Sequence, residues 1–114
     1  MKSVAQILKA KSDQSIYTVA PGASVYEAVR LMAEKNIGAL VVMEDEKIVG
    51  IITERDYARK IVLMARSSKD TPVREIMTDK VVCVRPTQTI EDCMGLMTDK
   101  RIRHLPVLEA KKVV

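Results

Sequence analysis

The chain contains two copies of one sequence pattern, and this internal repeat limits its fold more than any other feature. Residues 16–49 align without a gap on residues 81–114, at an offset of 65 positions. Eleven of the 34 aligned pairs are identical, whereas chance would give about two. A shorter segment, residues 4–8, recurs as residues 73–77 ahead of the second copy. The repeat indicates two similar units, each too small to bury its own apolar face alone.

Both copies show the same alternation of strand and helix signals. In each, a short β-branched strand precedes a helix that has a Ser or Thr cap and apolar residues three and four positions apart. A second strand and a third strand follow, and the first copy then has a closing helix. We therefore predict an α+β fold of two pseudo-symmetric β-α-β-β-α repeats packed sheet to sheet. The predicted strands include residues 16–19, 39–43, 81–84 and 104–108, and the predicted buried helical stripes are Val25, Ala28, Val29 and Met32 in the first copy and Ile90, Cys93, Met94 and Met97 in the second.

The repeat also predicts the domain boundaries. We expect a first repeat at residues 1–66, a linker at residues 67–72 and a second repeat at residues 73–114. The second copy stops at Val114, the partner of Val49, before its third strand is complete and without a closing helix. An unfinished strand would leave an open sheet edge. We therefore expect the natural chain to continue for about 25–30 residues, the length of the corresponding part of the first copy.

A Thr-x-x-Asp pattern lies where the third strand of the first copy gives way to its closing helix. The apolar segment 48–52 stops at Thr53, and residues with helical spacing follow Asp56. Backbone N–H groups are free at a helix start, and the helix dipole favours an anion there. Thr53 and Asp56 can therefore bind a ligand, or they can form a capping box that satisfies those N–H groups. Taken alone, the spacing favours the cap.

Composition and charge argue against several classes of partner. The net charge is +4, but the basic residues are interleaved with fifteen acidic ones, and three Tyr are the only aromatic side chains, so we expect no nucleic-acid partner. No segment has the length and hydropathy of a membrane span or a signal peptide, so we expect a cytoplasmic protein with no membrane partner. Cys83 falls in a predicted strand and Cys93 in a predicted helix, which indicates reduced, buried thiols.

Patterns typical of enzymes are missing from the sequence. There is one His, and the spacing does not bring together a Ser-His-Asp or Cys-His set. There is also no Gly-rich phosphate loop and no cluster with metal-ligand spacing. We therefore predict a protein that is not an enzyme and requires no metal.

With the repeat and the Thr-x-x-Asp corner in view, the chain resembles tandem CBS-domain proteins, in which two CBS repeats form a Bateman module. The resemblance covers essentially all 114 residues, and its most specific parts are Gly50-Ile51-Ile52-Thr53-Glu54-Arg55-Asp56 and Ile102-Arg103-His104-Leu105-Pro106-Val107. It implies a regulatory module for energy or redox sensing that binds an adenosine ligand in the cleft between the repeats and transmits a conformational signal. AMP, ADP or ATP is the expected ligand, with NAD(H) or S-adenosylmethionine as alternatives.

The resemblance also implies roles for individual residues. Asp56 is expected to hold the ribose hydroxyls, and Thr53 to lie beside the α-phosphate. The chemistry suits Asp56, because a carboxylate can accept hydrogen bonds from two neighbouring hydroxyls. Arg103 and His104 are expected to face the phosphates, with Arg55 as a further candidate. The residues expected to sandwich and read the adenine are Ile51, Lys80, Val81, Val82 and Ile102.

By the pseudo-symmetry of the family, a second site would use Ile16, Tyr17, Ile37, Gly38 and Ala39. Gly38 and Ala39 stand where the second copy has Arg103 and His104, so this site suits a ligand with less phosphate, a different adenosyl ligand or none.

The alternative function is a protein-interaction or dimerisation module in which Thr53 and Asp56 only cap a helix. The resemblance also implies a homodimer that uses the apolar face of the helix at residues 57–65, and a target protein on another chain whose identity the sequence does not give.

Overall fold

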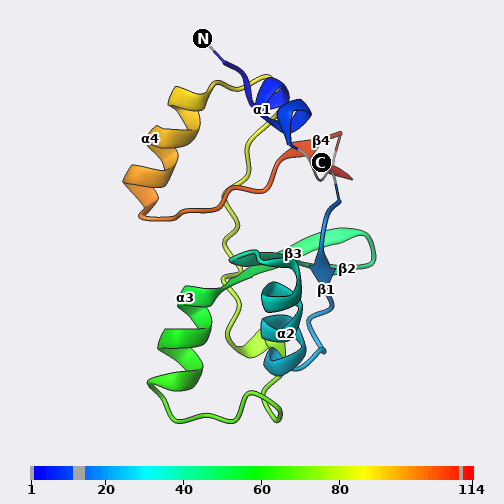
Figure 1. Cartoon of the computed structure of the whole chain (residues 1–114), viewed down its shortest axis with the longest axis vertical. Coiled ribbons are helices and arrows are strands. Elements are labelled where there is room, and N and C mark those ends of the chain that lie inside the picture. Colours follow the sequence, from blue (N-terminus) through cyan, green and yellow to red (C-terminus); the bar gives the residue numbers. More distant parts are fainter. Residues whose placement is uncertain (1, 12–14, 111) are drawn as a thin grey trace. The chain divides into compact units, whose positions relative to one another are not determined.

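The computed structural model describes residues 2–11, 15–110 and 112–114, and these form two compact units (Figure 1). Unit 1 comprises Met1–Ile16 together with Val82–Val114, and unit 2 comprises Tyr17–Val81. Each unit thus combines the main part of one repeat with the short segment that precedes the other repeat in the sequence. Helices and strands occur in both units, which confirms the predicted α+β class.

The sheet of unit 2 has three strands in the order β1-β2-β3. Strand β1 is Thr18–Val19, shorter than predicted, and it pairs in parallel with β2, Ala39–Glu44. Strand β3, Lys47–Thr53, pairs antiparallel with β2. The two turn residues between β2 and β3, Asp45 and Glu46, both have positive φ, at 51° and 64°. That geometry is typical of a tight hairpin.

Helices α2 and α3 of unit 2 lie on the same side of this sheet (Figure 1). Helix α2 is Val25–Lys35, and its first turn is capped by Ser24 Oγ, which accepts a hydrogen bond from Glu27 N at 3.1 Å. Helix α3, Glu54–Tyr57, continues as a π-helical segment at Ala58–Val62. The closing helix therefore begins at Glu54, directly after Thr53, its predicted cap. Its second half is wider than an α-helix, because Leu63 N donates to Ala58 O at 3.0 Å.

The core of unit 2 lies between the sheet and these helices, and a short 3₁₀ helix, Val73–Glu75, completes it. This helix is attached by hydrogen bonds from Val25 N to Thr71 O and from Val73 N to Ala23 O, both 2.8 Å long. Three of the four predicted stripe residues of α2 are buried, and Val29 is partly buried. The buried core residues are Val25, Ala28, Met32, Leu40, Val42, Ile52, Ile61, Val73 and Ile76.

Unit 1 contains two capped helices and a short hairpin. Helix α1 is Val4–Ala10 and helix α4 is Ile90–Lys100. A complete capping box starts each of them, formed by Ser3 with Gln6 and by Thr89 with Asp92, as predicted for α4. Strands β4, Leu108–Glu109, and β5, Lys112–Val113, pair antiparallel.

Three sequence predictions for unit 1 are wrong. The predicted strand at residues 81–84 is reduced to one isolated bridge between Val84 and Val107, and the predicted strand at residues 104–108 begins only at Leu108. No residue of α4 is buried, and Met94 is 61% exposed. In unit 2, by contrast, α2 packs against strand β2 and helix α3, and three of its residues are buried.

The two cysteines differ in part from the prediction. Both are free thiols, but each is only partly buried. Cys93 lies within α4 as expected, whereas Cys83 lies outside any strand.

Candidate functional site

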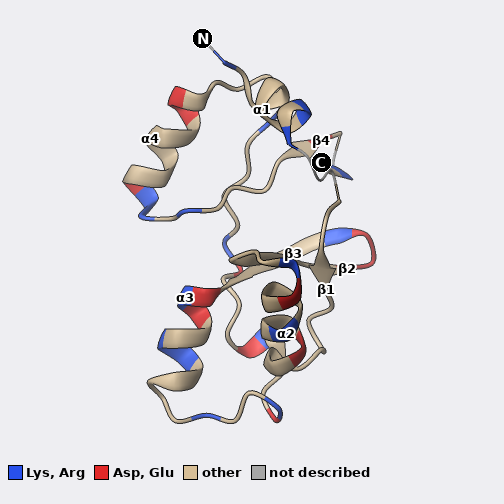
Figure 2. Ribbon diagram, in the orientation of Figure 1, with Lys and Arg blue, Asp and Glu red and all other residues tan. Residues whose placement is uncertain are grey.

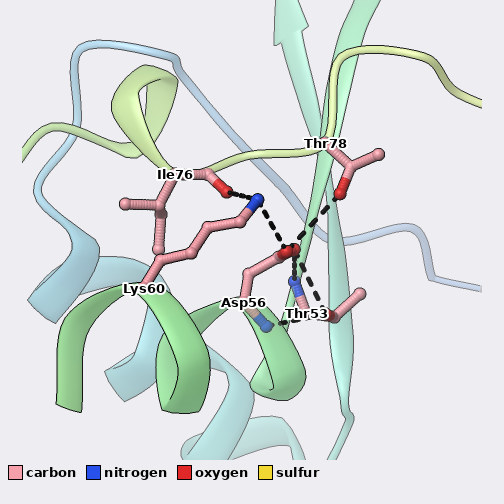
Figure 3. Close-up of polar contacts among 5 residues, drawn as sticks. All are labelled: Thr53, Asp56, Lys60, Ile76 and Thr78. Carbon is pink, nitrogen blue, oxygen red and sulfur yellow. Dashed lines mark hydrogen bonds and ion pairs between the residues drawn. The ribbon is translucent and has the colours of Figure 1, made fainter. Parts of the chain in front are cut away.

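The Thr-x-x-Asp corner sits where strand β3 ends and helix α3 begins. Thr53 is the N-cap of α3 and has extended backbone angles, φ −124° and ψ 165°. Its hydroxyl oxygen accepts a hydrogen bond from Asp56 N at 3.2 Å, and Asp56 Oδ2 accepts one from Thr53 N at 3.0 Å (Figure 3). Thr53 Oγ1 also lies 3.1 Å from Asp56 Oδ2 as a hydrogen-bond donor. The predicted capping box is therefore formed, and it uses only one oxygen of the carboxylate.

The other oxygen of Asp56 faces two residues that the sequence analysis did not single out. Lys60 Nζ lies 3.2 Å from Asp56 Oδ1, and Thr78 Oγ1 donates to the same atom at 3.4 Å (Figure 3). Lys60 Nζ also donates to the carbonyl oxygen of Ile76 at 2.9 Å. The Asp56 side chain is 10% exposed and the Lys60 side chain is 46% exposed. Asp56 thus joins helix α3 to the segment that follows the 3₁₀ helix.

That segment lies directly against strand β3. Ile51 N donates to Thr78 O and Thr78 N donates to Ile51 O, both at 2.9 Å. A Cβ atom at Gly50 would lie 2.6 Å from Met77 Sδ and 3.0 Å from Thr78 O. Gly50 is therefore the residue that allows residues 77–78 to approach β3 closely enough for Thr78 to reach Asp56.

Different signals in the sequence bear on Lys60 and Thr78. Lys60 follows Asp56 by four positions, which is the spacing of a favourable ion pair on a helix and could have been recognised. Thr78 is 22 residues away from Asp56, and only the folded chain brings the two together.

Unit 2 also contains three of the adenine candidates and the phosphate candidate Arg55. Ile51 is in β3 and partly buried, and Arg55 is exposed in the first turn of α3. Lys80 is exposed and Val81 is partly buried, and they follow Thr78 at the end of the unit.

Most residues predicted for a second site also belong to unit 2. Gly38 O accepts a hydrogen bond from Glu54 N at 3.0 Å, and Ala39 pairs with Thr53 between β2 and β3. Ile37 N donates to Met32 O at 2.9 Å, where α2 ends. Tyr17 is partly buried, and Lys35 Nζ lies 5.3 Å from the centre of its ring. The segment that precedes β2 is therefore attached to the start of α3, so the structure connects it to the corner formed by Thr53 and Asp56.

The other predicted residues belong to unit 1. Ile102 is partly buried just after α4, and its N–H donates to Met97 O at 3.0 Å. Arg103 and His104 follow it and are exposed. Val82 is partly buried and Ile16 is exposed.

The distribution of charge on α3 suits its dipole. Acidic residues occur in its first turn and basic residues in the turn that follows (Figure 2). Carboxylates near a helix N-terminus and cations towards its C-terminus both interact favourably with the dipole. Asp56 and Lys60 therefore stabilise the helix as well as each other.

Comparison with known proteins identifies the family of this chain. The model of the CBS domain matches residues 4–63 and 73–114. The chain belongs to the CBS-domain family. Among the solved CBS-domain structures, a putative signal-transduction protein with CBS domains from Burkholderia ambifaria MC40-6 is 58% identical, with a TM-score of 0.96, over 99% of this chain and 85% of that one.

Two further CBS-domain proteins are informative. The mitochondrial CBS domain-containing protein CBSX3 of Arabidopsis thaliana is 42% identical over 120 residues, which cover 98% of this chain but only 58% of that protein. The CBS domain pair of protein MJ0100, solved in complex with 5′-methylthioadenosine and S-adenosyl-L-methionine, is 27% identical with a TM-score of 0.84, over 100% of this chain and 86% of that one.

The described residues also bear on other kinds of site. No helix among them is long and apolar enough to cross a membrane. Within the same part of the chain, no group of three or more His, Cys, Asp or Glu side chains is placed to hold a metal ion.

Proposed function

We propose that this CBS-domain protein is a non-enzymatic regulatory module that binds an adenosine-containing ligand through Asp56 and conveys the bound state to a partner protein. The observation that carries the proposal is the Asp56 carboxylate, which lies almost buried at a strand-to-helix corner and links three segments of unit 2. A ligand that displaced one of these partners of Asp56 would change the contact between the segments that Asp56 connects. The structural relative solved with two adenosine derivatives supports this class of ligand.

The proposed ligand contacts begin with the ribose. Its two hydroxyls would donate to Asp56, while Thr53 would lie beside the first phosphate where the ligand carries one. Ile51, Lys80 and Val81 are the unit 2 residues proposed for the adenine. The contributions of Val82, Ile102, Arg103, His104 and Arg55, and those of the second site, stay predictions from the sequence.

Adenine and a ribose diol are common to all the candidate ligands. AMP, ADP or ATP is the expected form, and NAD(H) and S-adenosylmethionine share the same moiety. No metal is needed for a carboxylate to accept hydrogen bonds from a diol.

The test is calorimetric titration of the protein with AMP, ATP, NADH and S-adenosylmethionine, repeated with Asp56→Asn. The amide cannot offer the charged oxygen, so we expect an affinity loss of about 10- to 100-fold for the ligand that binds. Asp92→Asn is a matched control, because Asp92 makes the same cap with Thr89 in α4, at 3.1 Å for both hydrogen bonds. Unchanged ligand affinity in Asp56→Asn would contradict the proposed role of Asp56.

The second candidate function is an interaction module that binds no nucleotide. It is favoured by one observation: both oxygens of Asp56 already have partners within the chain. If none of the ligands gives a heat of binding and the protein is folded, the corner is only a helix cap.

A homodimer forms part of either function. The π-helical segment ends in an apolar stretch that continues two residues beyond it, and Val62, Leu63 and Met64 are 57%, 76% and 66% exposed. Contiguous exposed apolar residues of this kind are typical of an interface. Sedimentation of the protein and of Leu63→Glu tests this, because a dimer that used the face would dissociate in the variant. The predicted cytoplasmic location also stays a proposal, and the relative CBSX3 is named as mitochondrial.

A further inference from the structure

We propose that Lys60 competes with the ligand for Asp56 and thereby sets the affinity of the site and its preference between uncharged and phosphorylated adenosine ligands. This inference rests on the proposed function, because it concerns the same carboxylate. It differs from that function in naming a residue of this chain as the group that a ligand must displace.

The accessible hydrogen-bonding positions of Asp56 are all in use. A carboxylate has about four lone-pair positions, two on each oxygen. Thr53 N and Thr53 Oγ1 donate to Oδ2, at 3.0 and 3.1 Å. Lys60 Nζ forms an ion pair with Oδ1 at 3.2 Å, and Thr78 Oγ1 donates to the same oxygen at 3.4 Å. A ribose diol brings two donors and so needs positions that are occupied in the free protein.

A ligand can displace the partners of Oδ1 more easily than those of Oδ2. If a ligand took Oδ2, the backbone N–H of Thr53 at the start of α3 would lose its partner, which is costly in a partly buried position. Lys60 can leave Oδ1 more easily, because its side chain is nearly half exposed to water and its ammonium keeps the hydrogen bond to Ile76 O at 2.9 Å. The contact of Thr78 with Oδ1 is the longest of the four. The ligand therefore enters at Oδ1, and Lys60 is the principal group that it displaces.

Because Lys60 is charged, its effect on affinity should differ between uncharged and phosphorylated ligands. An uncharged nucleoside gains nothing from the ammonium and has only to displace it. A phosphorylated nucleotide also displaces it, but the cation then remains near the corner and offsets the repulsion between the Asp56 carboxylate and the phosphate. Removal of Lys60 should therefore favour adenosine more than AMP.

The experiment is calorimetric titration of adenosine and AMP into the wild-type protein and into Lys60→Met and Lys60→Gln. The methionine keeps the apolar stem, and the glutamine keeps a donor for Ile76 O, so at least one variant should retain the fold; circular dichroism and thermal unfolding check this. Because partly exposed ion pairs four residues apart on a helix are weak, we expect adenosine affinity to rise by only about two- to five-fold and AMP affinity to rise less.

Arg59→Met is the matched control. It removes the same charge from the neighbouring exposed position of the same helical segment, where no contact with Asp56 occurs. It should leave adenosine affinity unchanged, whereas an equal rise in Arg59→Met would show a general charge effect and overturn the proposal.

The remaining outcomes separate the two proposals. If the wild-type protein binds adenosine and both Lys60 variants bind it equally well or more weakly, Lys60 does not compete, while the proposed function stands. If neither the wild-type protein nor any variant binds adenosine, AMP or the other adenosine ligands, the proposed function is itself overturned. Binding of adenosine by the Lys60 variants but not by the wild-type protein would support both.

Discussion

Gly50→Ala tests whether the close approach of residues 77–78 to strand β3 is needed for the stability of unit 2. The added methyl group would lie 2.6 Å from Met77 Sδ, 3.0 Å from Met77 Cγ and 3.0 Å from Thr78 O. The Met77 side chain is flexible and can move aside. The Thr78 carbonyl belongs to the backbone and is fixed by its 2.9 Å hydrogen bond with Ile51 N, so it cannot move without loss of that bond.

The expected magnitude follows from these contacts. Insertion of a methyl group into a packed site of this kind costs about 1–3 kcal/mol. Gly50 has no positive φ, so alanine is compatible with its backbone and should recover about 0.5–1 kcal/mol of chain entropy. Because the Thr78 carbonyl cannot move aside, the upper half of the methyl cost applies, about 2–3 kcal/mol, and the net loss in the free energy of unfolding is about 1–2.5 kcal/mol. Each 1 kcal/mol of this loss lowers Tm by about 4–8 °C for a domain near this size.

Thermal and chemical unfolding, followed by circular dichroism, measure this loss. Gly95→Ala is the control, because nothing lies within 4 Å of a Cβ atom there and the position is within α4, so alanine should stabilise the helix by about 0.5–1 kcal/mol. The double variant Gly50→Ala, Met77→Ala separates the two contacts. Full rescue would show that the clash is with Met77, whereas we expect little rescue because the Thr78 carbonyl remains. A Gly50→Ala protein as stable as the wild type would refute the argument.

Two further predictions concern buried polar and titratable groups. Thr71 is buried, and its hydroxyl donates to Ser67 O at 2.7 Å. Thr71→Val should therefore lower the free energy of unfolding, measured by urea denaturation, by about 1–2 kcal/mol. Thr87 is exposed, and a loss in Thr71→Val as small as that in Thr87→Val would contradict this prediction. Burial raises the pKa of the Cys83 thiol, and burial and then the Asp92 carboxylate raise the pKa of Cys93. Because the thiolate is the reactive form, both should be alkylated by iodoacetamide at pH 8 more slowly in the native protein than in denaturant, and equal rates measured by mass spectrometry would show that the fold does not protect them.

The sequence predicted the first repeat better than the second. The apolar spacing in α2 and the alternation in β2 and β3 belong to elements that are packed on several sides, so pattern and burial agree. In unit 1, the same spacing in α4 leads to no buried residue, and the strand predicted at residues 81–84 makes one bridge. Periodicity shows which face of an element is suited to burial, but burial also needs a partner. Helix α2 has such partners in strand β2 and helix α3.

The candidate site was predicted in its local part and missed in its long-range part. Thr53 and Asp56 are three residues apart, and their capping geometry follows from local rules. The approach of Thr78 depends on the path of the segment after the 3₁₀ helix and on the absence of a side chain at Gly50. No pattern within a window of the sequence encodes that approach, although the presence of a glycine inside a β-branched strand is a known sign of close backbone contact.

The cap and the proposed ligand site at Asp56 are compatible because they use different oxygens. The cap fixes Oδ2 on Thr53, and this orients Oδ1 towards Lys60 and Thr78. In Asp56→Asn the amide oxygen can still accept from Thr53 N, but the amide nitrogen must then face the ammonium of Lys60, and two donors cannot satisfy each other. Asp92 forms the same cap and has Leu96, not a cation, four residues further along α4. Asp56→Asn should therefore cost about 1–2 kcal/mol and Asp92→Asn no more than about 0.5 kcal/mol, so the difference between these two variants measures what Oδ1 contributes beyond the cap.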